Sequence, residues 1–199
     1  MVTALDRAFL ERPSLEVAPA LLGAVLRHTT DAGTVAVRIT EVEAYVGQGV
    51  DPGSHAFRGK TARNASMFGE PGHLYCYFTY GMHVCANVVC SPEGEASGCL
   101  LRAGEVVEGI DLARFRRTTS KNDRDLAQGP ARLVVALGIS LGDDGSDLFA
   151  PPFELEPATG PVEHSTGPRT GLFGGADLPW RFWIPGEPSV SPYKKHPKA

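Results

Sequence analysis

Two carboxylates and a tyrosine lie within the stretch ITEVEAYVG, residues 39–47. Glu41, Glu43 and Tyr45 are spaced by two, so in an extended strand their side chains point to one face. A carboxylate can act as a general base that takes a proton from water, and an aromatic ring beside it can hold a flat substrate. The spacing therefore indicates a pocket at this face, but it does not choose between the two glutamates.

A strand is predicted over residues 34–45, where apolar and polar positions alternate. Counting by two places the glutamates on the face of the early apolar positions, while the later apolar positions move to the other face. The early positions are Val35, Val37 and Ile39, and the later ones are Val42 and Ala44. Such a strand would run from a core into a pocket.

A β-hairpin is predicted over residues 73–90, with Gly81 in its turn. Tyr75, Tyr77 and Thr79 would share one face of its first strand. The tip carries two large side chains, Tyr80 and Met82, which water would normally surround. A third strand, CLLRAG at 99–104, contains Arg102.

The remaining segments predict helices and a long loop. We expect a short helix capped by Ser14 that leads into a first strand within residues 14–27, and helices over 105–117 and 129–139. Residues 47–72 have no clear period and contain His55 and several cations, which favours a functional loop. Strand fragments within 143–179 and a late strand at 180–184 complete the chain.

These elements predict one α+β domain that spans residues 1–199. It would be built on a mostly antiparallel, curved β-sheet with surrounding helices and a protruding hairpin. A flexible basic tail is expected over about residues 188–199, with Lys194, Lys195 and Lys198.

Composition excludes several classes of function. The net charge of −4 argues against binding nucleic acid through bulk charge, although local clusters of Lys and Arg could do so. Apolar runs are too short for a signal peptide or a membrane span, which predicts a cytosolic protein without membrane contact. Neither a metal site nor a disulfide framework fits the spacing of the four cysteines, Cys76, Cys85, Cys90 and Cys99.

Four blocks resemble the alkyladenine (3-methyladenine) DNA glycosylase family in its bacterial members. They are EAYVG at 43–47, SHAFRGKTARNASMF at 54–68, PGHLYCYFTYGMHVCANVV at 71–89 and CLLRA at 99–103. The later segments GPARL and GPR are similar to that family too. The resemblance covers most of the chain, in the expected order and spacing.

The resemblance implies a monofunctional DNA glycosylase that starts base excision repair. Such an enzyme binds double-stranded DNA containing a damaged purine, flips the nucleotide out and hydrolyses its N-glycosidic bond. The purines would be 3-methyladenine, 7-methylguanine, ethenoadenine and hypoxanthine. The resemblance also implies a monomer without a cofactor, in the bacterial cytosol and associated with the nucleoid.

The resemblance assigns the chemistry to Glu43 and Arg102. Glu43 would be the general base that activates water, and its charge would favour the positive sugar of the transition state. Arg102 would help to hold the nucleotide's phosphate and the surroundings of the water. Glu41 lies outside the matched block, so we expect a supporting or a solvated group whose substitution matters far less than that of Glu43.

Base recognition and DNA contacts are implied for further residues. Tyr45, His55 and Tyr77 would stack on the flipped base, and Asn87 would crowd the exocyclic amine of guanine. Tyr80 would fill the hole left in the DNA, with Met82 against the neighbouring base pair. Contacts with the DNA backbone are expected from Arg58, Lys60 and Arg63.

Two other functions remain open at this point. One is a damage-sensing minor-groove DNA-binding protein with weak catalysis, against which the intact Glu43 argues. The other is a metal nuclease built on Glu41 and Glu43, although no cluster of metal ligands is evident. Because no amine nucleophile is assigned to the site, we expect water to attack and no strand-cleaving lyase step.

Overall fold

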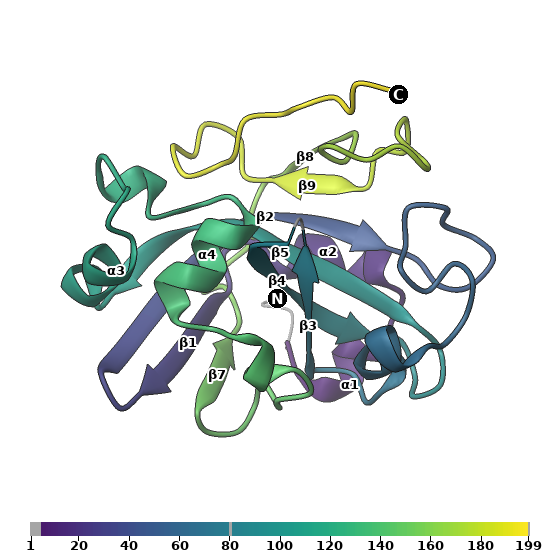
Figure 1. Ribbon diagram of the computed structural model, residues 1–199, viewed down its shortest axis with the longest axis horizontal. Helices are drawn as coiled ribbons and strands as arrows, with labels where there is room; N and C mark the ends of the chain where they lie inside the picture. The colour runs from purple at the N-terminus through teal and green to yellow at the C-terminus, as the bar shows by residue number, and fades with distance from the viewer. Residues whose placement is uncertain (1–4, 80, 199) are drawn as a thin grey trace.

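The computed structural model of the chain describes residues 5–79 and 81–198, and an antiparallel sheet is its centre (Figure 1). Six strands follow the order β3-β4-β5-β2-β1-β7, β6 pairs with β5, and β9 pairs with both β2 and β8. The strands are β1 (Val25–Thr30), β2 (Gly33–Tyr45), β3 (Leu74–Thr79), β4 (His83–Cys90), β5 (Ser97–Glu108), β6 (Ala127–Gln128), β7 (Phe153–Glu156), β8 (Ser165–Gly167) and β9 (Arg181–Trp183). This curled sheet with few helices confirms the predicted α+β class and the hairpin β3–β4.

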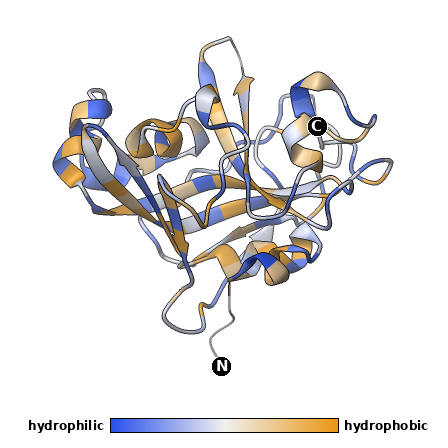
Figure 2. Cartoon of the chain, turned by 90° about the horizontal axis from the view of Figure 1, so that it is seen from below, coloured by the Kyte–Doolittle hydropathy of each residue, from blue (hydrophilic) through white to orange (hydrophobic). Residues whose placement is uncertain are grey.

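Helices cover the sheet and contribute to the larger of two buried clusters. The α-helices are α1 (Arg7–Leu10), α2 (Ser14–Leu21), α3 (Ile110–Arg116) and α4 (Pro130–Leu137), and short 3-10 helices are η1 (Ala62–Phe68), η2 (Asp123–Asp125) and η3 (Leu141–Asp143). Val17 and Leu21 of α2 and Leu133 and Leu137 of α4 join the apolar residues of the strands in one buried cluster. In Figure 2 hydrophobic residues recur along these strands and helices. Among the described residues, none of the helices has the length and apolar content needed to cross a membrane.

A β-bulge changes the faces of β2. Ile39 pairs with Gly104 of β5, but Glu41 pairs with Ala103, so Thr40 has no partner on β5. The extra residue shifts the alternation by one position. Both apolar sets of the strand, Val35, Val37 and Ile39 as well as Val42 and Ala44, therefore lie in the same core. The prediction that Val42 and Ala44 lie on the face opposite to Val35, Val37 and Ile39 is wrong. Because of the bulge, Glu41 and Glu43 lie on that opposite face instead.

The neighbours of β2 also change at this bulge. The first half of β2 pairs with β1 as far as Arg38, whereas Glu41 to Glu43 pair with β9. β5 has a matching irregularity, because Val42 pairs with Leu101 and Glu41 with Ala103, which leaves Arg102 without a partner on β2. Bulges of this kind re-aim side chains, and here they do so at the polar residues of the two central strands.

Two predicted helix boundaries are wrong. Ser14 is the first helical residue of α2 rather than its cap, and its Oγ donates a hydrogen bond to the carbonyl of Tyr45. Residues 105–108 continue β5, because they pair with β2, and α3 begins at Ile110. Gly109 separates the two elements in the left-handed region at φ +70°, where a Cβ would lie 2.1 Å from the Thr34 oxygen.

The C-terminal segment is anchored beyond Pro188. Gln128 Nε2 donates to the carbonyls of Pro188 and Val190, at 3.0 Å each, and the amide of Gly171 donates to the carbonyl of Lys194 at 2.7 Å. Figure 1 shows this segment, in yellow, running back past β9. The tail that the sequence predicts to be flexible is thus held by hydrogen bonds as far as Lys194.

His28 of β1 should make the fold sensitive to acid. Its ring is buried, stacks on Phe153 at 4.2 Å between centroids and lies 3.0 Å from the Leu137 carbonyl. Burial lowers the pKa of His28. The unfolded chain therefore binds a proton as pH falls below about 6.5, while the folded chain resists it, so stability is lost in that range. His28→Phe should flatten the pH dependence of the unfolding free energy between pH 7 and 5, measured by urea titration; an unchanged slope would contradict this assignment.

Candidate active site

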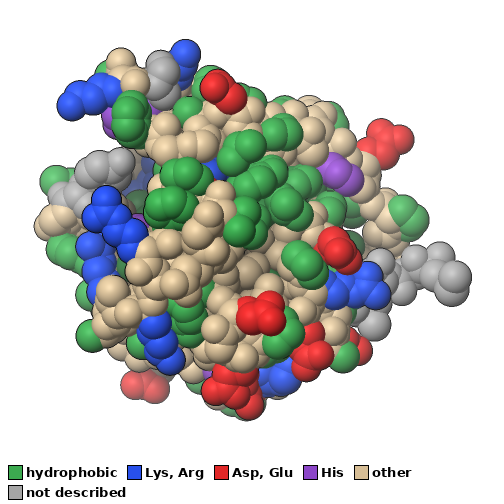
Figure 3. Space-filling view, turned by 90° about the vertical axis from the view of Figure 1, so that its right-hand side faces the viewer, with side chains coloured by type: hydrophobic (Ala, Val, Ile, Leu, Met, Phe, Trp, Pro, Cys, Tyr) green, Lys and Arg blue, Asp and Glu red, His purple; other side chains and the backbone are tan. Residues whose placement is uncertain are grey.

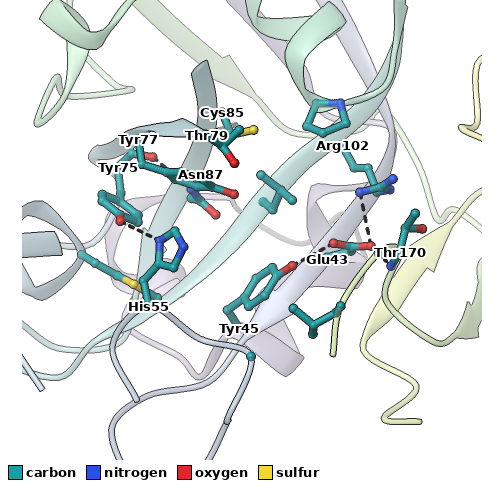
Figure 4. A pocket seen from close by; sticks show the side chains of 16 residues that line it. Glu43, Tyr45, His55, Tyr75, Tyr77, Thr79, Cys85, Asn87, Arg102 and Thr170 are labelled. Atoms are coloured by element: carbon teal, nitrogen blue, oxygen red, sulfur yellow. Dashed lines mark hydrogen bonds and ion pairs between the residues drawn. The ribbon is translucent and has the colours of Figure 1, made fainter. Parts of the chain in front are cut away.

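One cavity of about 230 Å³ collects the residues that the sequence singles out. Its walls come from β2, β3, β4, β5, the loop before η1, η1 itself, the start of α4 and the residues after β8. All the residues predicted for catalysis and base binding line it: Glu43, Tyr45, His55, Tyr77, Asn87 and Arg102. In Figure 4 Glu43, Arg102 and Thr170 are grouped at one end, and His55, Tyr75 and Tyr77 at the other.

A single row of the sheet forms the base of this cavity. Leu100 of β5 pairs with Asn87 of β4 on one side and with Glu43 of β2 on the other. The row continues from Asn87 to Tyr75 of β3, and from Glu43 to Arg181 of β9. Neighbouring strands are about 4.8 Å apart, so Asn87 and Glu43 are separated by roughly 10 Å along the row. Strand register therefore sets the distance between Asn87 and Glu43 in the cavity.

Glu43 is fully buried and each of its oxygens faces a donor. The Tyr45 hydroxyl donates to Oε2 at 2.9 Å, and the amide of Thr170 donates to Oε1 at 2.7 Å. Arg102 Nη1 lies 3.4 Å from Oε1. These contacts fix the orientation of the carboxylate at the inner end of the cavity, which is what a general base requires.

Tyr45 stays protonated beside this carboxylate. Burial raises its pKa well above the ordinary value of 10, and the charge of Glu43 adds to the effect. One side of its ring faces Arg169, whose Cζ is 4.5 Å from the ring centroid. Arg169 is itself fully buried between the rings of Tyr45 and Trp180. The phenol is thus a fixed donor, and its ring is supported from within the protein.

The other end of the cavity is aromatic. The rings of His55 and Tyr77 meet edge to face with centroids 4.5 Å apart, and His55 Nδ1 lies 2.9 Å from the Tyr75 hydroxyl. Burial lowers the pKa of His55, with a smaller effect from Arg63, so the ring is neutral at pH 7. Burial also raises the pKa of Tyr75 to about 12. Uncharged aromatic rings are therefore available here for contact with a flat ligand.

The loop that carries His55 is more ordered than its sequence suggests. The 3-10 helix η1 occupies residues 62–68 within it. Asn64 Nδ2 donates to the carbonyls of His55 and Gly59, at 2.9 and 3.0 Å, and so ties the two ends of the loop's turn together. Asn87 Nδ2 donates to the Tyr75 carbonyl at 3.0 Å, which anchors that side chain at the bottom of the cavity.

Glu41 lies outside the cavity and is fully buried, so the solvated interpretation is wrong. Its Oε1 accepts hydrogen bonds from Arg102 Nε at 2.9 Å and from Arg181 Nε at 2.6 Å. Its Oε2 accepts from the amide of Ser191 at 2.7 Å. Of the described residues that hydrogen-bond to Glu41, only Arg102 lines the cavity.

Sequence reasoning missed several residues around the site. The amide of Thr170 donates a hydrogen bond to Glu43. Arg169 makes a bidentate ion pair with Asp51, with Nη1 at 2.6 Å from Oδ2 and Nη2 at 2.7 Å from Oδ1. Both partners of that pair are fully buried. The segment GPR at 167–169 offered a signal, because it resembles the glycosylase family. Asp51 lies in the loop QGVDPGS, between the blocks 43–47 and 54–68 that carry the resemblance, so the resemblance gave no signal for it.

The predicted DNA-contacting residues that the structure describes are exposed to solvent. Met82 is 69% exposed at the hairpin tip, and Tyr80 is outside the described residues. Arg58, Lys60 and Arg63 are exposed, and Arg63 Nη2 donates to the carbonyl of Phe78 at 3.0 Å. Figure 3 shows Lys and Arg side chains gathered toward the left edge of one face. In residues 5–79 and 81–198 no group of three or more His, Cys, Asp or Glu could hold a metal ion.

The cavity combines a buried carboxylate, a neighbouring arginine and aromatic walls within an antiparallel sheet. This combination suits a hydrolase that acts on a flat substrate. Residues 8–188 match the sequence model of the methylpurine-DNA glycosylase (MPG) family. The chain therefore belongs to the methylpurine-DNA glycosylase family, and it is a hydrolase that acts on DNA.

Similar proteins support this assignment. A protein of Leifsonia xyli subsp. xyli named "Putative 3-methyladenine DNA glycosylase" is 68% identical over 193 residues, which cover 94% of this chain and 91% of that protein. Proteins with the same name from Streptomyces avermitilis and Nocardia farcinica are 56% and 52% identical. The alignments cover 98% and 90% of this chain, and 93% and 86% of those proteins.

Proposed function

We propose that this DNA glycosylase removes alkylated and deaminated purines from double-stranded DNA and so starts base excision repair. Its substrates would be 3-methyladenine, 7-methylguanine, ethenoadenine and hypoxanthine, and the names of its relatives support the first of these. It would act as a monomer in the bacterial cytosol, at the nucleoid. The observation that carries the proposal is the position of Glu43, held by three donors where an aromatic cavity ends.

Glu43 would act as the general base. In the proposed step a water molecule forms a bond to the anomeric carbon of the sugar, and the glycosidic bond breaks with its electron pair left on the purine nitrogen. Glu43 accepts the proton of the water, and its charge stabilises the positive sugar that forms. Arg102 lines the cavity with Nη1 at 3.4 Å from Glu43, and from this position it would hold the nucleotide's phosphate and the surroundings of the water.

The damaged base would lie between Tyr45 on one side and His55 with Tyr77 on the other. Such a base must leave the double helix first, because its reactive carbon is shielded in the stack. Alkylation at a ring nitrogen makes the purine cationic, and electron-rich rings attract it by about 0.5 to 2 kcal/mol. A neutral His55 avoids repulsion with such a base. Asn87, fixed on the Tyr75 carbonyl, would exclude the extra amine of guanine.

The hairpin would hold the DNA open. Met82 at its tip is exposed, as a side chain that packs against a base pair must be, and Tyr80 beside it would fill the gap left by the flipped nucleotide. Arg58, Lys60 and Arg63 would contact phosphates of the backbone.

One assay tests the reaction. The protein is incubated with a duplex that contains a single ethenoadenine or hypoxanthine, with and without a chelator, and half of each sample is then treated with alkali. We expect strand breaks only after alkali, in equal yield with the chelator. Breaks without alkali would point to a lyase or a nuclease, and lesion binding without base release would support the alternative of a damage sensor.

A further inference from the structure

We propose that Glu41 is a positioning residue, which with Arg181 and the Ser191 amide fixes the direction in which Arg102 points. This inference rests on the proposed roles of Glu43 and Arg102. Glu41 itself does not line the cavity, so it would touch neither the DNA nor the water. Its effect on base release would pass through Arg102.

Backbone pairing does not determine the orientation of the Arg102 side chain. Arg102 occupies the irregularity of β5 and has no partner on β2, so strand pairing on that side does not set its orientation. A hydrogen bond of 2.9 Å from its Nε to Glu41 supplies the missing constraint. A guanidinium group is planar and rigid, so a fixed Nε also fixes the plane that carries Nη1. Nη1 then lies 3.4 Å from Glu43 Oε1, in the cavity.

Glu41 can hold Arg102 because it is itself held from the opposite side. Arg181 Nε donates to the same Oε1 at 2.6 Å, and the Ser191 amide donates to Oε2 at 2.7 Å. Arg181 is fixed in turn, because its Nη2 donates to the Ser191 carbonyl at 3.0 Å and its Cζ lies 4.6 Å from the Trp183 ring centroid. The C-terminal segment thus closes a chain of contacts that ends at Glu43.

Charge balance explains how this arrangement can be buried. Two carboxylates, Glu41 and Glu43, face two guanidinium groups, Arg102 and Arg181, and the exposed fractions of all four residues are 0%, 0%, 8% and 5% in that order. If Arg102 paired only with Glu43, it could approach that carboxylate closely and compete with the water for it. Glu41 draws the Nε side of Arg102 away and leaves Glu43 with the longer contact of 3.4 Å, compared with 2.9 Å to Glu41.

A double-mutant cycle on the rate of base release tests the inference. Glu41→Gln should slow single-turnover release of the damaged base by roughly 10- to 100-fold, since misplacement of a catalytic group by about 1 Å has effects of this size. Affinity for lesion DNA should change less than the rate. In Arg102→Gln the Glu41→Gln change should have little further effect, because its route to the site is already gone. Independent, multiplicative losses would overturn the inference, because they would mean that Glu41 acts by another route.

Two further variants separate positioning from folding. Glu105→Gln changes another glutamate of the same strand pair, in an exposed ion pair with Arg38, and should leave the rate unchanged. Arg181→Lys keeps a charge beside Glu41 and should retain more of the rate than Arg181→Gln, when both are compared per mole of folded protein. Equal rates in these two variants would count against the chain of contacts. A wild-type protein that releases no base would overturn the proposed function itself, whereas an active wild type with an unaffected Glu41→Gln variant would overturn only the positioning role.

Discussion

Replacing Glu43 with glutamine is expected to slow release of the damaged base by about 10²- to 10⁴-fold, the range for loss of a general acid or base. Glutamine is as large as glutamate, and its oxygen can still accept the hydrogen bond from the Thr170 amide. Its new amino group would face Tyr45, whose hydroxyl can turn and accept. Because the cavity is preserved, affinity for DNA with a single lesion should stay near that of the wild type. Single-turnover rates and binding titrations on one duplex measure both quantities.

The contrast with Glu41 sharpens this expectation. Glu41→Gln lies two residues away on the same strand and should cost less, because it acts only through Arg102. Equal losses in the two variants would contradict the assignment of the general base to Glu43. Loss of lesion binding in Glu43→Gln, in step with the loss of rate, would show instead that the carboxylate holds the substrate.

A large loss of stability is expected when the buried ion pair of Asp51 and Arg169 is broken. Asp51→Asn should lower the free energy of unfolding by about 3 to 5 kcal/mol, because it leaves a guanidinium group buried without its counter-charge. Both residues have fully buried side chains, and Asp51 also accepts from the amides of Val46 and Gly53. Urea titration at pH 7 measures the difference directly.

An exposed pair of similar geometry provides the control. Arg114 donates to both oxygens of Asp123 at 2.9 Å, but both side chains are 53% exposed. Asp123→Asn should leave the unfolding midpoint unchanged, because exposed ion pairs contribute little. If the two substitutions had equal effects, burial would not be what makes the Asp51 pair important. Asp51→Asn should also slow base release, since Arg169 supports the ring of Tyr45.

The alternation of apolar and polar residues was sufficient to predict the strands that contribute to the cavity. Alternation located β2 and the hairpin, and it placed Tyr75, Tyr77 and Thr79 on one face, which lines the cavity. The resemblance of four blocks to a known family then selected the six cavity residues. Their roles in the reaction remain predictions. Strand register brings five of them together, and the loop that Asn64 holds adds His55.

The features that escaped prediction depend on contacts between distant residues. A bulge at Thr40 cannot be read from alternation, because one extra residue looks like an ordinary change of face. Glu41 is bound by Arg181 and Ser191, which follow it by 140 and 150 positions. The Glu105 segment has a helical pattern, yet pairing with β2 determines its structure. Long-range pairing overrides local preference in each case.

The row of the sheet that begins at Tyr75 and ends at Arg181 has a consequence for how this enzyme gains its activity. Five strands contribute one residue each to that row, and the last of them joins only when residues 181–183 are in place. A chain cut before β9 would still carry Glu43 and Arg102, but it would lack the Arg181 side chain that holds Glu41. Base release should therefore be slower in such a chain, and the full rate should require that β9 is docked against β2.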